Sequence, residues 1–388
     1  MAEAREIVIV GGGAAAHAAA ASYREAGGEL ALRILAAEVE LPYERPPLTK
    51  EYLRGESARG DLLLAHNGWY REHGVEVETG AAVAALDLEA GEARGTDGRC
   101  WSFDRCLLAT GARPLVPDLP GADGPDVRVV RTISDSEQLR ALADCTVLVV
   151  GSGFIGCEAA ASLAQLGAKV TVATLEASPL IERLGEEASK RIRGWLEERG
   201  VELMAEASLA AIEAGPGGSR AHFEDGREAG ADGVVLALGI ARNDELAAAA
   251  GVAAEDGVRV DAAMVSSNPR LLAAGDVAAA QNDSAGRRLR VEHWGEALEM
   301  GAVAGRTLAG VESVWDTAPG FWSTIGDRSL KYAGWGDGWD EVRFEERPGG
   351  GFVARYGRDG ELVGVLAHED DDAYEAGRDE VRRRVPWS

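Results

Sequence analysis

The amino-acid sequence predicts an α/β fold with two Rossmann-like domains and, in addition, a small α+β domain at the C-terminus. An apolar run of strand length, residues 7–10, leads into a glycine-rich turn and an alanine-rich helix. The same succession of strand, glycine-rich turn and helix returns near residue 146. With 388 residues, 50 of them glycine and 46% of them apolar, the chain has the length and composition of an α/β protein of two or three domains.

The first glycine-rich turn has the spacing of a dinucleotide-binding loop. Gly11, Gly13 and Ala16 form a GxGxxA motif between the first strand and its helix. Glycine lets the backbone turn tightly and approach a diphosphate, whose charge is met by free amides and by the helix dipole. The next strand, LALRIL, leads to Glu38, whose carboxylate can accept hydrogen bonds from ribose hydroxyls. These residues predict one bound dinucleotide.

The motif recurs later in the chain, in VLVVGSGFIGCEAAASLAQLG. Gly151, Gly153 and Gly156 again stand between an apolar strand and a helix. Two such loops in one chain indicate two dinucleotides. The economical pair is a flavin and a nicotinamide, because hydride passes directly between them.

Two further strands that run into glycine indicate that the first domain is discontinuous. LLLATGARPLVP ends a strand at Ala109, Thr110 and Gly111, and the prolines that follow mark an exit from the domain. NPRLLAAGDVA gives a strand that runs into Gly275 and Asp276 before a helix-like stretch. The predicted domains are a flavin-binding domain of residues 1–114 and 241–316, a nicotinamide-binding domain of residues 115–240 and a C-terminal domain of residues 317–388.

The charge and the apolar runs exclude two classes of partner. A formal net charge of −25 opposes nonspecific binding to nucleic acid or to an anionic membrane surface, since both need a basic footprint. No apolar run approaches the length of a membrane span or a signal peptide. We therefore expect a cytoplasmic protein with no nucleic-acid or membrane partner.

The cysteines predict no metal centre. Cys100, Cys106, Cys145 and Cys157 form no CxxC or CxxxxC pair, so neither a zinc site nor an adjacent redox disulfide is indicated. We expect all four to be buried, reduced thiols.

Taken together, six motifs resemble one family of flavoproteins. The GxGxxA loop, LPYERPPLTK, LLATGARP, VVGSGFIGCE, DGVRVD with NPRLLAAGDVA, and RVEHWGEALEMGAVAG occur in the order and spacing of the ferredoxin reductase type of FAD-dependent pyridine nucleotide oxidoreductase. That family includes putidaredoxin reductase, dioxygenase ferredoxin reductases, rubredoxin reductases and apoptosis-inducing factor. The resemblance is strong to about residue 335 and thin beyond it.

The resemblance gives the proline-rich segment a role. It implies that residues 41–53 wrap the flavin, with Arg45, Pro46 and Lys50 at the matching positions. The prolines preset φ, so the segment loses less entropy when it orders around a cofactor. Lys50 is then expected to pair with Glu158 and to donate a hydrogen bond towards the flavin, which makes these two the predicted catalytic residues.

The resemblance also implies the rest of the two binding sites. A helix beginning near Glu292 would stabilise negative charge on the reduced flavin through its N-terminus. The further residues expected around FAD are Ala14, Ala109, Thr110, Gly111, Arg113, Gly275, Asp276, Glu292, His293, Trp294 and Trp322. Those expected around NAD(P)H, besides the glycines and Glu158, are Phe154, Ile155, Thr174, Glu176, Leu238 and Gly239.

Two departures from the family pattern affect these expectations. Thr174 stands where the family often places the glutamate that selects the unphosphorylated coenzyme, and Glu176 follows two positions later. No arginine is close enough in sequence to bind a 2′-phosphate, so the prediction is NADH, with NADPH as the alternative. Arg242 occupies a position where the family usually has proline.

The resemblance predicts a flavoprotein reductase that moves electrons from NAD(P)H through FAD to a [2Fe-2S] ferredoxin, or a similar small carrier, that serves an oxygenase or cytochrome P450. Arg287, Arg288 and Arg290 would help to dock an acidic carrier. The alternative is an NADH-responsive flavoprotein of the apoptosis-inducing-factor type without a redox partner. A related NADH oxidase or disulfide reductase would need a cysteine beside the flavin, and residues 41–53 contain none. The expected state is a monomer or a homodimer.

Overall fold

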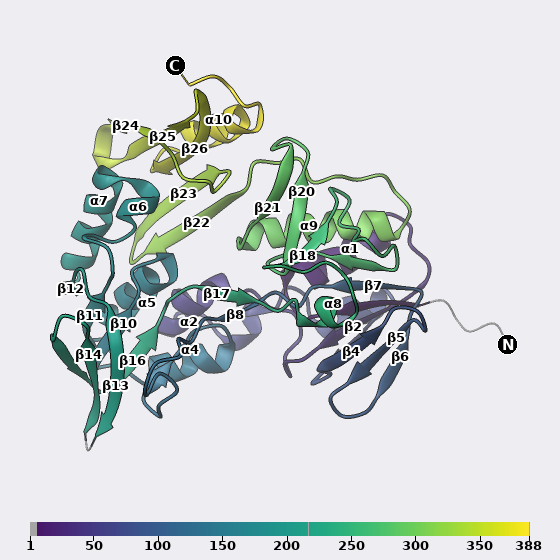
Figure 1. Ribbon diagram of the computed structural model, residues 1–388, viewed down its shortest axis with the longest axis horizontal. Helices are drawn as coiled ribbons and strands as arrows, with labels where there is room; N and C mark the ends of the chain where they lie inside the picture. The colour runs from purple at the N-terminus through teal and green to yellow at the C-terminus, as the bar shows by residue number, and fades with distance from the viewer. Residues whose placement is uncertain (1–5, 216, 388) are drawn as a thin grey trace.

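The computed structural model describes residues 6–215 and 217–387 and contains two parallel sheets, with a C-terminal sheet at the top of the view (Figure 1). In the first parallel sheet the strand order is β19-β7-β1-β2-β3. Ile7, Val8 and Ile9 of the central strand are buried, as expected for a strand covered on both faces. The strands are β1 (Glu6–Val10), β2 (Ala31–Ala36), β3 (Val75–Thr79), β7 (Arg105–Leu108) and β19 (Leu271–Ala273).

The second parallel sheet repeats this design. Its strand order is β12-β11-β10-β16-β9, and all four pairings are parallel. Its strands are β9 (Val127–Arg128), β10 (Thr146–Val150), β11 (Lys169–Ala173), β12 (Glu202–Met204) and β16 (Gly233–Leu236), and its helices are α4 (Ile133–Arg140), α5 (Phe154–Gln165), α6 (Ile181–Leu184) and α7 (Glu186–Glu197). The prediction of an α/β fold with two Rossmann-like cores is confirmed.

Two short strands cross between the parallel sheets. β8 (Ala112–Pro114) and β17 (Ile240–Arg242) pair antiparallel, with Pro114 opposite Ile240, and Figure 1 shows them between the two sheets. The chain therefore leaves the first sheet and returns to it along the same path. The predicted exit near residue 114 and the predicted return near residue 241 lie side by side.

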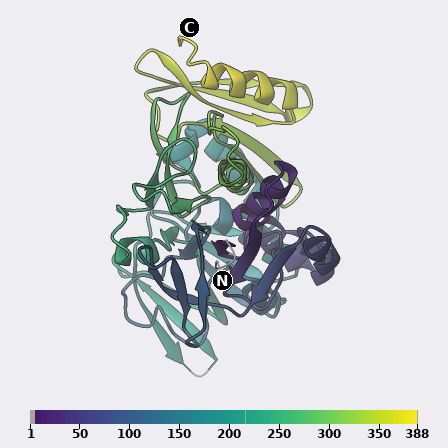
Figure 2. The same ribbon diagram turned by 90° about the vertical axis from the view of Figure 1, so that its right-hand side faces the viewer.

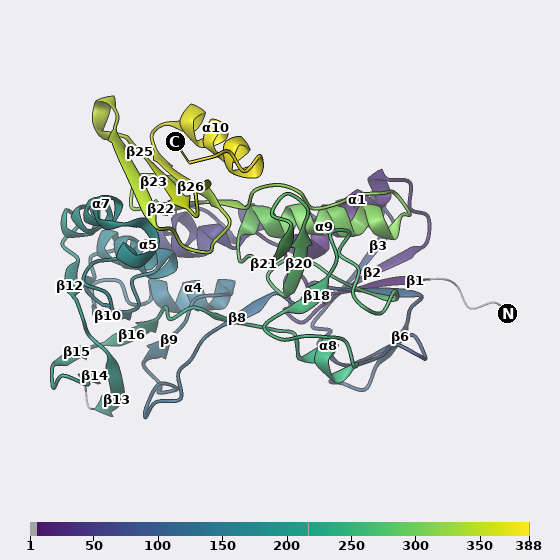
Figure 3. The ribbon, with the colours of Figure 1, turned by 45° about the horizontal axis from the view of Figure 1, so that its top comes forward.

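Helices α1 (Ala14–Glu25) and α9 (Trp294–Leu308) lie against each other on the first sheet (Figure 3). A Cβ atom on Gly301 would lie 2.4 Å from the carbonyl oxygen of Ala15, and one on Gly305 would lie 2.3 Å from that of Ala19. Small residues on both helices therefore permit the close approach. Because the contacts advance by four residues in the same direction on each helix, the helices are parallel, and both N-termini point to the same end of the sheet.

The C-terminal sheet is antiparallel, in the order β22-β23-β26-β25-β24. Helix α10 (Asp371–Arg382) lies across one face of it (Figure 2), where a Cβ on Gly377 would lie within 3 Å of the Val365 side chain. This agrees with the predicted α+β unit. The strands are β22 (Gly320–Ile325), β23 (Arg328–Gly334), β24 (Glu341–Glu346), β25 (Phe352–Arg358) and β26 (Glu361–His368).

Smaller elements surround these layers. Three small sheets are β4-β5-β6 and β13-β14-β15, which are antiparallel, and β18-β20-β21, which is mixed because β18 and β20 are parallel. Their strands are β4 (Val83–Asp87), β5 (Glu92–Gly95), β6 (Cys100–Ser102), β13 (Leu209–Gly215), β14 (Gly218–Phe223), β15 (Glu228–Ala231), β18 (Val258–Val260), β20 (Ala278–Asn282) and β21 (Arg287–Arg290). The short helices are α2 (Glu51–Arg54), α3 (Asn67–Glu72), α8 (Glu245–Ala249) and three 3₁₀ turns, η1 (Pro46–Thr49), η2 (Arg59–Leu62) and η3 (Pro348–Gly350).

The expectation of four buried thiols is wrong for two of them. All four cysteines are free; Cys106 and Cys157 are buried, whereas Cys100 is exposed and Cys145 is partly exposed. Cys100 begins β6, a strand at the edge of its three-stranded sheet, where alternate side chains face solvent. Within the described residues, no helix has the length and apolar character needed to cross a membrane.

Candidate functional site

One cavity of about 1580 Å³ extends between the two parallel sheets and under the C-terminal sheet. It lies at the carboxyl ends of the strands, the usual ligand position in open α/β sheets. Its volume exceeds the roughly 300–1,000 Å³ of a pocket for one small ligand, so it has room for more than one. Both glycine-rich loops, the proline-rich segment, the start of α9 and strand β22 contribute to its walls.

The cavity brings together every predicted site residue except Ala16 and Gly156. Both exceptions occupy the third position of their motif and are buried. A Cβ on Gly156 would lie 2.1 Å from the carbonyl oxygen of Gly151, so this position lets the helix approach the loop and does not face a ligand.

The first glycine of each loop has a backbone conformation that side chains oppose. Gly11 has φ of 129° and Gly151 has φ of 108°. A Cβ at Gly11 would lie 2.0 Å from the carbonyl oxygen of Ala109. Helices α1 and α5 begin directly after these loops, and neither has a side-chain cap at its N-terminus. Their first amides are therefore available to an anion such as a diphosphate.

The structure pairs the two predicted catalytic residues. Lys50 Nζ lies 2.6 Å from Glu158 Oε2, and the two residues are only 7% and 2% exposed. Thr49 Oγ1 donates to the same carboxylate oxygen at 2.6 Å, and Lys50 Nζ also donates to the carbonyl of Pro46. A buried ion pair is stable only when additional hydrogen bonds satisfy its polar atoms, and η1 supplies two of them here.

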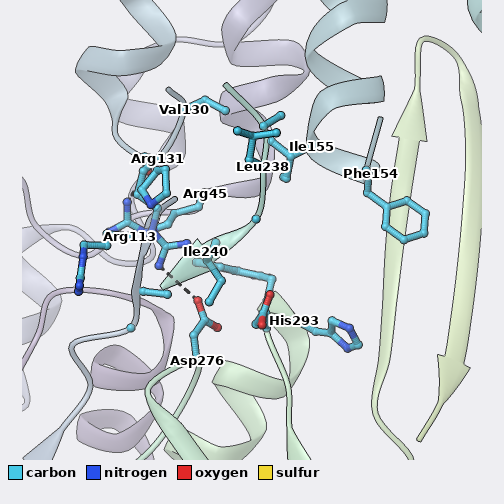
Figure 4. A pocket seen from close by; sticks show the side chains of 18 of the residues that line it. Arg45, Arg113, Val130, Arg131, Phe154, Ile155, Leu238, Ile240, Asp276 and His293 are labelled. Atoms are coloured by element: carbon cyan, nitrogen blue, oxygen red, sulfur yellow. Dashed lines mark hydrogen bonds and ion pairs between the residues drawn. The ribbon is translucent and has the colours of Figure 1, made fainter. Parts of the chain in front are cut away.

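A second charged group lies at one end of the cavity, where Figure 4 shows Arg45, Arg131 and Asp276 gathered. Arg45 binds Glu38 Oε1 at 2.6 Å and donates to the Arg131 carbonyl. Arg131 approaches Asp276 Oδ2 at 3.3 Å. Burial, together with the nearby charge of Arg45, lowers the pKa of Arg131. Two guanidinium groups in repulsion form a favourable site for a dinucleotide diphosphate.

The start of α9 provides another polar wall. Glu292 pairs with Arg242 Nη2 at 2.8 Å, and burial raises the pKa of Glu292. Arg242 also binds Asp256, which explains an arginine where the family usually has proline. His293 packs against Phe321, with ring centres 4.6 Å apart, and its Nδ1 is buried without a partner.

His293 makes stability sensitive to acid. Burial lowers the pKa of His293 from the ordinary value of 6.5 to about 3. The unfolded chain therefore binds a proton as pH falls through about 6.5 while the folded protein does not, so folding free energy is lost across that window at about 1.4 kcal/mol per pH unit. Urea unfolding of the ligand-free protein measures this effect. Between pH 7 and pH 5 the free energy of unfolding should fall by about 2 kcal/mol less in His293→Leu than in the parent. His222→Leu serves as the control, and equal losses in the parent and His293→Leu would contradict the prediction.

The predicted coenzyme end is formed by the second loop and the end of β11. Ser152 Oγ and Thr174 Oγ1 lie 2.7 Å apart and are both buried. The Glu176 amide donates to Thr174 Oγ1, and Glu176 Oε2 accepts from the amide of Glu182. Thr174 therefore shapes the loop, and both Thr174 and Glu176 line the cavity.

Sequence reasoning missed several residues of the cavity wall. Arg131 is a lone arginine before the capping box of α4 and carries no motif. Arg183 also lines the cavity, and its side chain makes no hydrogen bond or ion pair among the described residues. Its charge adds to burial in lowering the pKa of His293, so it faces the start of α9. Tyr332 comes from β23 of the C-terminal sheet and belongs to none of the six motifs.

Among the described residues that line the cavity there is no cysteine. Cys157, the cysteine that directly precedes Glu158, is buried behind the second loop. Its Sγ donates to the Ser152 carbonyl at 3.3 Å. Burial raises the pKa of the Cys157 thiol, which keeps it protonated and unreactive.

Known proteins resemble this chain over most of its length. The reductase component of an anthranilate 1,2-dioxygenase system from Burkholderia cepacia, named as a ferredoxin–NAD(+) reductase, is 34% identical over 94% of this chain and 91% of its own. Putidaredoxin reductase of Pseudomonas putida is 30% identical over 87% of this chain and 82% of its own. The crystal structure of the covalent putidaredoxin reductase–putidaredoxin complex matches with a TM-score of 0.92 and 28% identity, covering 98% of this chain and 94% of that one.

The family model described as pyridine nucleotide-disulphide oxidoreductase matches residues 5–301. That segment contains both glycine-rich loops, the Lys50–Glu158 pair and the return of the chain to the first sheet. The chain therefore belongs to the pyridine nucleotide-disulphide oxidoreductase family.

Proposed function

We propose that the protein is an FAD-dependent reductase that takes electrons from NADH and delivers them to a small iron–sulfur protein of the ferredoxin type. The observation that carries this proposal is the buried Lys50–Glu158 ion pair, which lies on the wall of the cavity between the two dinucleotide loops. Relatives that span most of the chain, and are named as ferredoxin reductases, support it. FAD, when bound, supplies the exchange between two-electron hydride chemistry and single-electron transfer.

The residues of the chain divide the work by position. Arg45 and Arg131, with the amides at the start of α1, would hold the FAD diphosphate. The amides at the start of α5 would hold the coenzyme diphosphate. Lys50 would place a hydrogen-bond donor at the meeting point of the two rings. The half-buried aromatic wall of Phe154 and Phe321, whose ring centres are 4.7 Å apart, would help to exclude water.

The decisive experiment is spectroscopic. The purified protein, reconstituted with FAD, should show a flavin absorption band that NADH bleaches without oxygen. Adding an oxidised [2Fe-2S] ferredoxin should then restore the flavin band while the ferredoxin is reduced. Failure to bind FAD, or a bound flavin that neither NADH nor NADPH reduces, would overturn the proposal.

The arginine patch predicted for carrier docking is partly neutralised. Arg287 pairs with Asp337, and Arg290 with Asp256, while Arg288 makes no ion pair among the described residues. Docking of an acidic carrier at this patch stays a prediction, and ionic strength tests it. If neutral substitutions at the three arginines change neither the transfer rate nor its salt dependence, the carrier docks elsewhere.

A reduced flavin that passes its electrons to no carrier protein would favour the alternative function. A protein that NADH reduces slowly, that transfers electrons to none of the ferredoxins tested and that dimerises on coenzyme binding would belong to the coenzyme-responsive class. The absence of cysteine from the described cavity wall argues against disulfide reduction.

Glu176 is expected to favour NADH over NADPH. Its carboxylate at the coenzyme end would accept hydrogen bonds from the ribose hydroxyls of NADH and would repel the 2′-phosphate of NADPH. Glu176→Ala should raise kcat/KM for NADPH relative to NADH by about tenfold, equivalent to ~1.4 kcal/mol. Glu187→Ala, at an exposed position of α7, is the control. An unchanged ratio in Glu176→Ala would remove this residue from coenzyme selection.

A further inference from the structure

The carboxylate of Glu158 is held by donors from two distant parts of the chain. Oε2 accepts from Lys50 and Thr49 of the proline-rich segment, each at 2.6 Å. Oε1 accepts from Ser323 Oγ at 2.7 Å and from the Thr324 amide at 3.3 Å, both on β22 of the C-terminal sheet. Each oxygen thus has two donors, and one of the two pairs comes from the C-terminal sheet.

We propose that Ser323 is a positioning residue for hydride transfer, because it fixes the carboxylate that in turn fixes the Lys50 ammonium. The inference rests on the proposed function and adds to it a requirement for the C-terminal sheet. It concerns a side chain that does not line the cavity and acts only through Glu158.

Alternation along β22 explains how Ser323 reaches the pair. Phe321 and Ser323 point to one face of the strand, whereas Trp322 points to the other and is 45% exposed. Phe321 packs against Phe154 at the start of α5, and Ser323 lies one turn further along that helix, opposite Glu158. Ser323 itself is only 1% exposed. The strand is therefore anchored on α5, and the Ser323 hydroxyl has no water to bind in place of the carboxylate.

Loss of the Ser323 hydroxyl would leave Oε1 with only the longer bond from Thr324. A buried carboxylate that lacks a donor reorients towards those that remain. Here they are the Lys50 ammonium and the Thr49 hydroxyl, both already bound to Oε2. The ammonium would be drawn away from the position at which it serves the ring edge, because a hydrogen bond to a charged group is among the stronger contacts in a protein.

The test is rapid mixing of FAD-loaded Ser323→Ala with NADH under anaerobic conditions. The rate constant of flavin bleaching at saturating NADH should fall by about tenfold, the loss expected for one hydrogen bond to a charged group. The dissociation constant for NADH should stay within about twofold, since Ser323 does not touch the coenzyme end. The midpoint potential of the bound flavin should become more negative, because a displaced ammonium stabilises the reduced flavin less.

Two variants separate positioning from general packing. Ser323→Thr keeps the hydroxyl and should recover most of the lost rate. Ser162→Ala removes another buried hydroxyl of α5, which donates to the Thr49 carbonyl at 2.7 Å without contacting Glu158, and should bleach at the parent rate. Ser323→Cys, with similar volume and a weak donor, replaces the alanine variant should that variant fail to fold.

The possible outcomes are distinguishable. A parent protein that NADH does not bleach would defeat the proposed function itself. A parent that bleaches normally beside an equally fast Ser323→Ala, or equal slowing in Ser162→Ala, would overturn the positioning role and leave the proposed function intact. An unchanged flavin potential in Ser323→Ala would also overturn it.

Discussion

Replacing Lys50 with methionine should slow reduction of the bound flavin by NADH roughly 10²–10³-fold, the usual consequence of removing a donor from a water-excluded redox or catalytic centre. The same change should lower the free energy of unfolding by about 3–5 kcal/mol, because Glu158, at 2% exposure, would be left as an uncompensated buried charge. Stopped-flow absorbance measures the first effect, and urea unfolding measures the second.

A double variant tells these two effects apart. Lys50→Met combined with Glu158→Gln removes both charges, so most of the stability should return while the hydride step stays slow. Arg193→Met, at an exposed ion pair with Glu197 in α7, is the control and should change stability by less than about 1 kcal/mol. Normal bleaching in Lys50→Met would show that the ion pair is only structural.

Replacing Gly156 with alanine should abolish reduction by NADH while leaving FAD bound. The new Cβ would lie 2.1 Å from the carbonyl oxygen of Gly151, so α5 must move away from the loop whose amides would hold the coenzyme diphosphate. Overpacking of this kind costs about 1–3 kcal/mol, and the affinity for NADH should fall at least about a hundredfold, or ~2.7 kcal/mol. Titration with NADH, followed by dithionite as a chemical reductant, measures both properties.

Gly194 supplies the matched control for Gly156→Ala. It lies within α7, and a Cβ there would meet no atom within 4 Å. Gly194→Ala should therefore leave NADH reduction unchanged and stabilise the protein by up to about 1 kcal/mol. If dithionite also fails to reduce Gly156→Ala, the flavin site was lost as well, and the second loop does not act alone.

The features that could be predicted from short stretches of sequence are those that depend on neighbouring residues alone. Both glycine-rich turns were predictable because glycine spacing between an apolar strand and a helix reports a backbone need that few other sequences have. The Lys50–Glu158 pair was predictable only through family resemblance, since the two residues are 108 positions apart. Ser323 lies 165 positions from Glu158, and nothing in FWSTIG marks a serine that reaches another domain.

Charge and burial were harder to predict than fold. The sequence presents Arg287 and Arg290 as a basic patch, yet the folded chain places a carboxylate beside each. Arg131, conversely, carries no motif in the sequence and becomes a partly buried cation beside Asp276. Cys100 was expected inside and lies at a sheet edge. Each case depends on which distant segment becomes a neighbour, and composition carries no information on that.

The parallel packing of α1 and α9 has a consequence for biosynthesis. The ligand end of the first sheet is built from a helix that starts at Ala14 and from another that starts at Trp294. Strand β19 of the same sheet also comes late in the sequence. A ribosome must therefore deliver nearly all of α9 before the ligand end of the first parallel sheet is complete. The proposed binding of FAD is therefore expected late in translation, after the second parallel sheet has been synthesised.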